Sequence, residues 1–198
     1  IRITNVNGKT IDLSDIKYFD PADYKENTKS YEVNYGDILV AMSGATTGKI
    51  GFYDCDHTAY INQRVGKFLP AKGVLDNRYL YHYLLLQVDK INMLAGGGAQ
   101  PNLSSNILKE KLLIPIPCPD DPKKSLAIQA EIVRILDAFT SLTAELTLRQ
   151  KQYNYYRNQL LTFSEEEVDW KPLGELGELV RGNGIPNKTD FTEHGVPA

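Results

Sequence analysis

The chain has 198 residues, 42% of them apolar and 24% charged. That composition is typical of one or at most two globular domains with a sizeable core, and it argues against a disordered chain. Lysine and arginine number 22 against 25 acidic residues, so the formal net charge is −3. This charge gives no support to a polycationic nucleic-acid binder, and any DNA binding has to rely on local basic charge.

Cysteine, histidine and apolar runs narrow the class of protein further. Cys55 and Cys118 lie far apart, and with the three histidines they form neither a metal-ligand spacing nor a disulfide framework. We therefore expect a reducing, cytoplasmic location and no bound metal. The apolar runs are short and no signal region is visible, so we expect no membrane span. A chain that starts at Ile1 and ends at Ala198 also leads us to expect a cut at both ends.

The first 119 residues are predicted to mix strands and helices. Short apolar runs bounded by Gly, Asn and Asp predict strands at residues 1–3, 37–41, 49–53 and 65–69. Composition predicts a helix over 75–94 with Asp76 or Asn77 as its cap, and a shorter helix capped by Ser104 or Ser105. We expect an α+β fold, a mixed α/β class with a small β-rich globule.

A long helix is predicted over residues 123–163. Neither glycine nor proline occurs from Lys123 to Lys171, and the residues that fill this interval favour helix. Spacings of four and three alternate strictly along it and define one stripe, which we call the seam. The seam consists of Ile128, Ile132, Ile135, Phe139, Leu142, Leu146, Arg149, Tyr153, Tyr156, Leu160 and Phe163.

The length of this helix bears on what covers the seam. About forty residues at about 1.5 Å each reach roughly 60 Å, more than the diameter of a globule of about 120 residues. We therefore favour a coiled coil with a second helix, although packing within one compact chain stays open. Val133 and Leu136 widen the stripe near its start, as expected where a helix rests on its own globule.

Two polar loops carry side chains that could contact a polyanion. Residues 43–49 resemble a phosphate loop, but only three residues separate the glycines and Ile50 follows Lys49. The stretch is therefore either a turn between two strands or an exposed loop that offers Lys49 and hydroxyls. Residues 96–102 are similarly polar, and they either end a helix or form a second such loop.

Catalytic patterns are missing from the sequence. No nucleophile elbow, paired-histidine metal site or dinucleotide fingerprint occurs, and the tetrapeptide of a methyltransferase base pocket is absent. Asp54 and Asp56 are interpreted as solvated turn acids. We expect that this chain is not an enzyme by itself.

Three groups of residues resemble a known family. One motif runs from Ile-Pro-Ile-Pro at residues 114–117 through residues 126–137, and a second occupies residues 151–161. Together they are similar to the conserved long helix of a known family. Residues 35–40 with Gly44 and Gly48, and residues 97–102, are similar to a target-recognition domain. Residues 173–176 and 181–186 look like the start of such a domain. The family is the specificity subunits of type I restriction-modification systems.

The resemblance implies a non-catalytic DNA reader. Members carry two target-recognition domains, each for half of a bipartite site, held apart by two antiparallel helices. Modification (methyltransferase) and restriction subunits dock on this frame, so S-adenosylmethionine and ATP are expected only on those partners. An interaction module that dimerises through its helix and binds no DNA is the alternative.

The order of the parts differs from the family pattern. Residues 1–119 look like the later part of a recognition domain, whereas the start of one lies in 164–198, after the helix. The chain is then either a circular permutation or an internal piece of a two-domain subunit. We predict a homodimer with antiparallel helices, in which residues 172–198 complete the partner's domain.

The DNA contacts expected from this resemblance are polar or basic side chains on loops, which can reach base edges or phosphates. They are Ser43, Thr46, Thr47, Lys49, Gln63, Arg64, Gln100, Asn102, Asn183 and Lys188.

Overall fold

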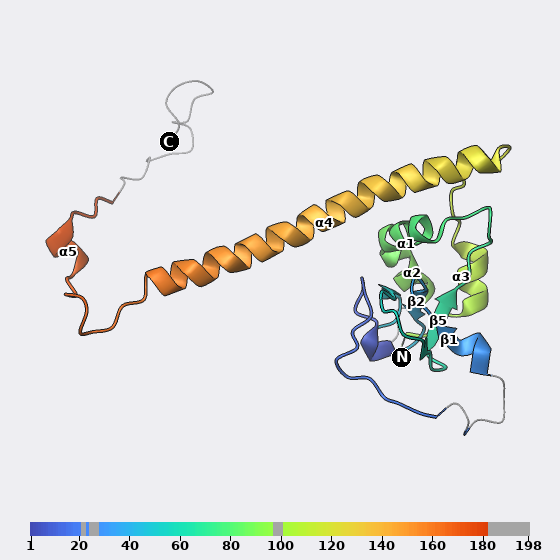
Figure 1. The fold of residues 1–198 in the computed structure, drawn as a ribbon, viewed down its shortest axis with the longest axis horizontal. Helices are drawn as coiled ribbons and strands as arrows, with labels where there is room; N and C mark the ends of the chain where they lie inside the picture. The colour runs from blue at the N-terminus through green and yellow to red at the C-terminus, as the bar shows by residue number, and fades with distance from the viewer. Residues whose placement is uncertain (21–22, 24–27, 97–100, 182–198) are drawn as a thin grey trace, which may run out of the picture. The chain divides into compact units, whose positions relative to one another are not determined.

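The computed structural model describes residues 1–20, 23, 28–96 and 101–181 (Figure 1). The chain divides into two units, Ile1–Ala144 and Glu145–Ala198. The first unit mixes short strands with helices, which confirms the α+β class. Its strands are β1 (Glu32–Val33), β2 (Ile38–Ala41), β3 (Ile50–Phe52), β4 (Ala59–Tyr60) and β5 (Val65–Phe68). Its helices are η1 (Ile3–Asn5), η3 (Thr28–Tyr31), α1 (Asn77–Leu86), α2 (Val88–Leu94), α3 (Ser105–Lys111) and the first part of α4 (Pro122–Leu160).

Strand β2 is the centre of a three-stranded antiparallel sheet of order β3-β2-β5. All four of its residues are buried. Since side chains alternate along a strand, Ile38 and Val40 point into one core, and Leu39 and Ala41 point into another. The unbroken apolar run in β2 is therefore explained by cover on both faces of the sheet.

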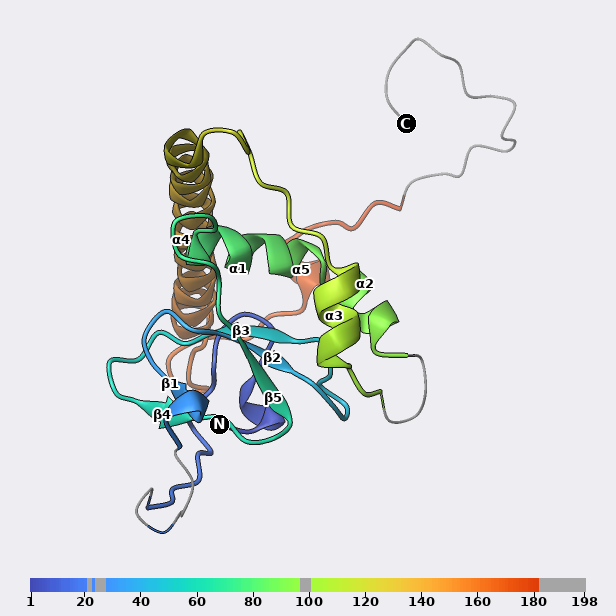
Figure 2. The ribbon, with the colours of Figure 1, turned by 90° about the vertical axis from the view of Figure 1, so that its right-hand side faces the viewer.

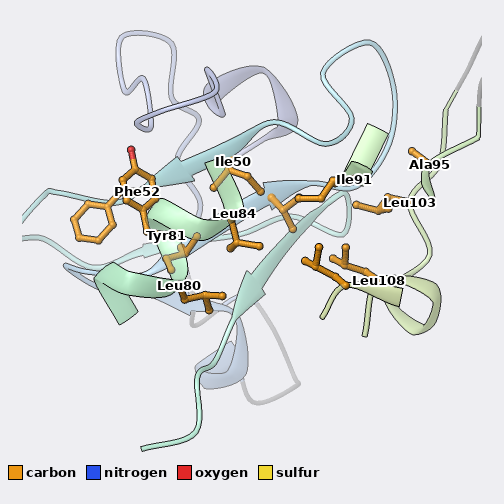
Figure 3. Close-up of a cluster of buried hydrophobic side chains, with 12 residues drawn as sticks. Ile50, Phe52, Leu80, Tyr81, Leu84, Ile91, Ala95, Leu103 and Leu108 are labelled. Atoms are coloured by element: carbon orange, nitrogen blue, oxygen red, sulfur yellow. The ribbon is translucent and has the colours of Figure 1, made fainter. Parts of the chain in front are cut away.

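The first core lies between the sheet and helices α1, α2 and α3 (Figures 2 and 3). Helix α1 begins at a capping residue, Asp76, whose carboxylate accepts a hydrogen bond from the Tyr79 N–H at 2.9 Å. One face of the helices and the facing strand residues fill this core. Its buried members include Ile50, Phe52, Leu80, Tyr81, Leu84, Ile91, Leu103 and Leu108.

The second core lies on the opposite face of the sheet. The N-terminal segment and the small β1–β4 pair cover it. Tyr53 is completely buried there, and its hydroxyl donates a hydrogen bond to the His57 carbonyl at 2.8 Å. The other buried members are Ile1, Val6, Ile11, Val33, Leu39, Ala41, Ala59 and Val65.

Two predictions about local structure are wrong. Residues 1–3 form no strand, because residues Ile3–Asn5 turn into a 3-10 helix that the Asn5 side chain holds through the Arg2 N–H and the Asp12 carbonyl. The single helix predicted over 75–94 is two helices, α1 and α2, which meet at Gln87. No glycine or proline marks that break in the sequence.

Helix α4 confirms the long predicted helix, with shifted ends. It begins at Pro122, where a missing N–H costs no hydrogen bond, and the Asp121 carboxylate caps the Lys124 N–H at 3.0 Å. The helix ends at Leu160, so Phe163 of the predicted seam lies three residues beyond it.

Polar groups dock the start of α4 on the globule. Gln129 is completely buried and its amide joins α4 to the segment before α1. Its Oε1 accepts from the Asp76 N–H at 2.7 Å, and its Nε2 donates to the Val74 carbonyl at 3.0 Å and to Ser125 Oγ at 3.1 Å. One buried side chain therefore bonds two partly buried backbone groups of the segment before α1.

Two turns further along, Asp137 adds a charged contact between α4 and α1. Its carboxylate pairs with the Arg78 guanidinium and lies 2.7 Å from Nε2 of His82. Partial burial works to raise the pKa of Asp137, but hydrogen bonds from Arg78 and His82 outweigh it, so the pKa lies below its ordinary value. The guanidinium also stacks on the Phe52 ring, 4.4 Å from the centroid.

The seam is a different face of α4 from the docking face. With 3.6 residues per turn, the contacts of Ser125, Gln129 and Asp137 centre about 120° around the helix from the seam. Phe139, Leu142 and Leu146 of the seam are 61%, 60% and 68% exposed. Contact with its own globule half-buries Ile128 and Ile132 but leaves the seam uncovered from Ile135 onward, as a coiled coil with another helix requires.

The second unit contains the end of α4 and helix α5 (Leu173–Leu176). Its described residues, 145–181, include no buried side chain. Seam positions continue along it as exposed aromatic and leucine side chains, namely Tyr153, Tyr156 and Leu160. In the part of the chain that the structure describes, no helix has the length and apolar content to cross a membrane.

Replacing Gln129 by alanine tests the docking of α4. Gln129→Ala removes the hydrogen bonds to the partly buried Asp76 N–H and Val74 carbonyl and leaves a cavity at a completely buried side chain, so we expect the free energy of unfolding to fall by about 2 to 4 kcal/mol. Urea denaturation followed by circular dichroism measures it. Gln150→Ala, at an exposed position of the same helix, should change it by less than about 0.5 kcal/mol. Equal effects of the two changes would contradict this role of Gln129.

Candidate nucleic-acid interface

Three segments meet at one end of the three-stranded sheet. Residues 42–49 join β2 to β3, residues 62–64 precede β5, and residues 101–103 precede α3. Because β3 and β5 both run antiparallel to β2, their first residues lie at the same end of the sheet. Lys49 and Arg64, one residue before each strand, are therefore brought to the two sides of the β2 end. We call these three segments the interface loops.

The backbone of Met42 ties the interface loops together. Its N–H donates to the Arg64 carbonyl at 2.8 Å, and its carbonyl accepts from the Leu103 N–H at 2.7 Å. The next residue, Ser43, pairs with Asn102 in an isolated antiparallel bridge. Residues 60 positions apart in the sequence are thus held side by side by the register of the sheet.

The buried Thr47 side chain links residues 42–49 to residues 101–103. It is only 9% exposed, and its Oγ1 lies 2.6 Å from the Gly44 carbonyl oxygen and 3.1 Å from the Pro101 carbonyl oxygen. Gly48 adopts a φ of +83°, and a Cβ there would lie 2.1 Å from Oδ1 of Asn92 on α2. The loop can approach α2 this closely because glycine has no side chain. The prediction of a turn between two strands is confirmed for residues 43–49, which lie between the end of β2 and the start of β3.

The described candidates for DNA contact differ in exposure. Four of them are exposed: Lys49, Gln63, Arg64 and Asn102. Ser43 and Thr46 are half-buried, and Thr47 is buried with its hydroxyl engaged in the loop. Gln100, Asn183 and Lys188 lie outside the described residues. The assignment of all ten to DNA contact stays a prediction.

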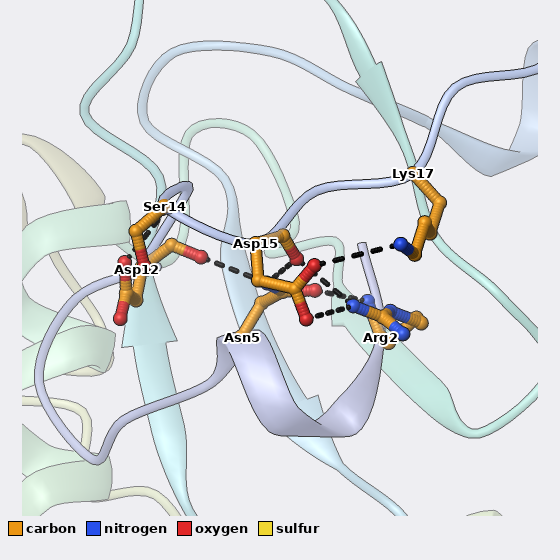
Figure 4. Close-up of polar contacts among 6 residues, drawn as sticks. All are labelled: Arg2, Asn5, Asp12, Ser14, Asp15 and Lys17. Carbon is orange, nitrogen blue, oxygen red and sulfur yellow. Dashed lines mark hydrogen bonds and ion pairs between the residues drawn. The ribbon is translucent and has the colours of Figure 1, made fainter.

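Sequence reasoning missed the N-terminal segment beside the interface loops. Thr46 Oγ1 donates to the Ile3 carbonyl at 3.0 Å and the Asn62 N–H donates to the Ile1 carbonyl at 3.0 Å, so the first residues of the chain lie beside the interface loops. In Figure 4, the Arg2 guanidinium donates to the Asp15 carboxylate at 2.8 Å, and the Asn5 amide donates to the Asp15 carbonyl at 3.0 Å. The short spacing of Asn and Asp over residues 5–15 is the only sequence signal for this network.

The N-terminal network pairs the Arg2 side chain with an acid, which distinguishes it from the basic side chains of the interface loops. The hydrogen bond from Arg2 and its charge hold the pKa of Asp15 below its ordinary value, and Lys17 adds to this at 3.7 Å. Arg2 is therefore neutralised by an ion pair. Lys49 and Arg64, in contrast, form no ion pair with any residue of the described ranges. Within the interface loops, these two basic groups therefore have charge available for a phosphate.

The exposed amide and basic side chains of the interface loops are groups that can donate hydrogen bonds to base edges and phosphates. Across the described residues, no three His, Cys, Asp or Glu side chains gather as a metal site would require. Asp54 and Asp56 are both exposed, as expected of turn acids.

Comparison with known proteins identifies the family. Residues 5–153 match the family described as type I restriction modification DNA specificity domain. The chain belongs to this family. The match includes the interface loops, both cores and most of α4 within one family unit.

Several specificity subunits are similar to this chain. It is 53% identical over 207 aligned residues to the Type I restriction enzyme EcoR124I/EcoR124II specificity subunit of Escherichia coli, covering 90% of this chain and 50% of that protein. It is 58% identical over 163 residues to the EcoprrI specificity subunit of Escherichia coli, covering 75% and 39%. A putative specificity subunit of Haemophilus influenzae, S.HindORF215P, is 34% identical over 185 residues, covering 83% and 43%. The chain spans half of the length of these relatives or less.

Replacing Thr47 by valine tests the link between the loops. Thr47→Val keeps the branched shape but removes the hydroxyl, so we expect a loss of about 1 kcal/mol in the free energy of unfolding. The amide of Gly44, which donates to the Pro101 carbonyl, should exchange its hydrogen faster. Ser43→Ala is the control, because the Ser43 hydroxyl bonds to no described residue, and its effect should stay within about 0.5 kcal/mol. Unchanged exchange at Gly44 in Thr47→Val would refute the link.

Proposed function

We propose that this chain is a DNA-sequence-recognition part of a type I restriction-modification complex. The observation that carries the proposal is the convergence of exposed Lys49, Arg64 and Asn102 on one end of the sheet, held by backbone bonds through Met42. Family membership supports it, since the similar full-length proteins are named specificity subunits. Residues 1–119 then form the larger part of a target-recognition domain that reads half of a bipartite site in double-stranded DNA.

Recognition divides between two kinds of contact in this proposal. Lys49 and Arg64 bind phosphates and set the position of the globule on the duplex, whereas Asn102 and Gln63 reach base edges. The chain carries out no catalytic step of its own. Modification and restriction subunits assemble with it, and S-adenosylmethionine and ATP bind on those partners.

The salt dependence of DNA binding tests the phosphate contacts. In Lys49→Ala and in Arg64→Ala, we expect weaker binding to random-sequence duplexes and a slope of log K against log [salt] smaller by about 1 for each change. Gel shift or fluorescence anisotropy from 50 to 200 mM salt measures it, with the modification subunit present. Lys171→Ala, an exposed cation paired with Asp169 in the second unit, is the control and should leave the slope unchanged. Slopes that match the unsubstituted chain in all three variants would refute these contacts.

The uncovered seam supports a homodimer in which two α4 helices pair antiparallel. The described seam positions alternate at coiled-coil spacing and are exposed from Ile135 to Phe163. A two-fold pair would bury the same face in both copies, and residues 164–198 would complete the partner's domain. This arrangement would carry two recognition globules on one frame, as a bipartite site requires.

Charged substitutions in the seam test the dimer. Leu142→Asp with Leu146→Asp should raise the dissociation constant by about 100-fold or more, because burial of one leucine contributes about 1.5 to 3 kcal/mol. Light scattering after size exclusion at micromolar concentration measures the mass. Leu148→Asp is the matched control, since Leu148 is 65% exposed on the opposite side of the same helix, and it should remain dimeric. A monomeric unsubstituted chain at this concentration would overturn the dimer.

The same preparations separate DNA recognition from a purely structural role. Sequence-selective binding, seen when a defined target competes better than random duplex, supports the specificity function. A stable dimer that joins the modification subunit but never selects DNA would favour an interaction module instead.

A further inference from the structure

An apolar groove of about 570 Å³ lies on the first unit, between β5, α1 and α3. Its floor contains the buried side chains of Val40, Leu80 and Leu84, and its walls include Phe68 and Leu75. Most of the lining is aliphatic, and Lys109 of α3 is the exposed cation at its rim. A surface of this kind suits an amphipathic segment that carries apolar side chains on one face and acids on the other.

The described part of the second unit contains a segment with those properties. Residues 161–181 include eight large apolar side chains, and all of them except the half-buried Val168 are exposed. Leu173 and Leu176 lie one helical turn apart on α5, so both project from the same face. Glu175 and Glu178 accompany them, and residues 164–181 carry six acids against two bases. An exposed apolar segment of this density marks a binding surface.

We propose that the groove binds residues 173–180 of a second copy of this chain. Leu173 and Leu176 enter the apolar lining, and Glu175 and Glu178 face Lys109. The charges match, because the segment is acidic and the rim is basic. This inference rests on the antiparallel dimer proposed above and names the surface on which its two copies complete each other.

The position of the groove favours a second copy as the source of the segment. Leu75 lines the groove, and its neighbours Val74 and Asp76 are the backbone groups that Gln129 of α4 binds. The groove therefore opens beside the start of α4. In a symmetric antiparallel pair whose seam runs from 128 to 163, residue 163 of one copy lies opposite residue 128 of the other. Ten residues from there to Leu173 span at most about 35 Å, which is enough to reach the groove.

Cysteine cross-linking between two variants tests the proposal. In a chain with Cys55→Ser and Cys118→Ser, one preparation carries Leu176→Cys and another carries Leu69→Cys, at an exposed leucine that lines the groove. The two are mixed, allowed to exchange subunits and oxidised mildly. We expect a disulfide-linked product of twice the chain mass, because docking brings the two positions within disulfide range.

A matched position controls for random collision. Leu86→Cys replaces Leu69→Cys in a parallel mixture, since Leu86 is equally exposed on α1 but does not line the groove. The groove pair should give at least about tenfold more linked product at micromolar concentration, as expected when docking raises the effective concentration to the millimolar range.

The outcomes separate this inference from the dimer on which it rests. Equal yields at positions 69 and 86, in a mixture that light scattering shows to be dimeric, would overturn the docking and leave the dimer intact. A linked monomer from a chain with both Leu69→Cys and Leu176→Cys, with no product between chains, would overturn the second copy as the source. A chain that is monomeric throughout would overturn the dimer and the docking together.

Discussion

The burial of β2 on both faces is the constraint on which the rest of the globule depends. Ile38 and Val40 belong to the core under the helices, whereas Leu39 and Ala41 belong to the core under the N-terminal segment. A register shift of one residue would exchange these two sets, so the pairing with β3 and β5 is strongly specified. The strand leads directly into Met42, whose backbone groups bind the other two interface loops. The positions of Lys49 and Arg64 are therefore consequences of sheet register and do not depend on loop flexibility.

Helix α4 has two different faces, a polar one that docks on the globule and the apolar seam. Its docking face is held by the Gln129 amide and the Asp137 carboxylate, which have fixed partners on the globule. Polar contacts of this kind specify one orientation, because a displaced helix would leave buried groups without hydrogen bonds. The seam is apolar apart from Arg149, and burial of this area is what would hold a partner helix in the dimer proposed above. The residues that orient the helix on its globule are therefore different from those that the proposed dimer would bury.

The sequence predicted the parts of this fold that local patterns control. The long helix followed from the absence of glycine and proline between Lys123 and Lys171, and the strands at 38–41, 50–52 and 65–68 followed from short apolar runs. The break at Gln87 and the 3-10 helix at Ile3–Asn5 could not be predicted in this way. The 3-10 helix depends on the Asp12 and Asp15 carbonyls, which the Asn5 side chain binds across 7 and 10 residues. The break at Gln87 has neither a glycine nor a proline to mark it in the sequence.

What the sequence determined by itself was the family, the α+β class, the long helix with its seam and a set of polar loop residues. Those features are carried by composition, by periodicity and by short motifs, which need no knowledge of contacts. Only the tertiary structure decided that residues 42–49, 62–64 and 101–103 form one surface, that Arg2 is neutralised by Asp15, and that Gln129 belongs to the docking face. These features depend on hydrogen bonds between segments up to about 60 residues apart, and such long-range contacts cannot be inferred from local sequence patterns.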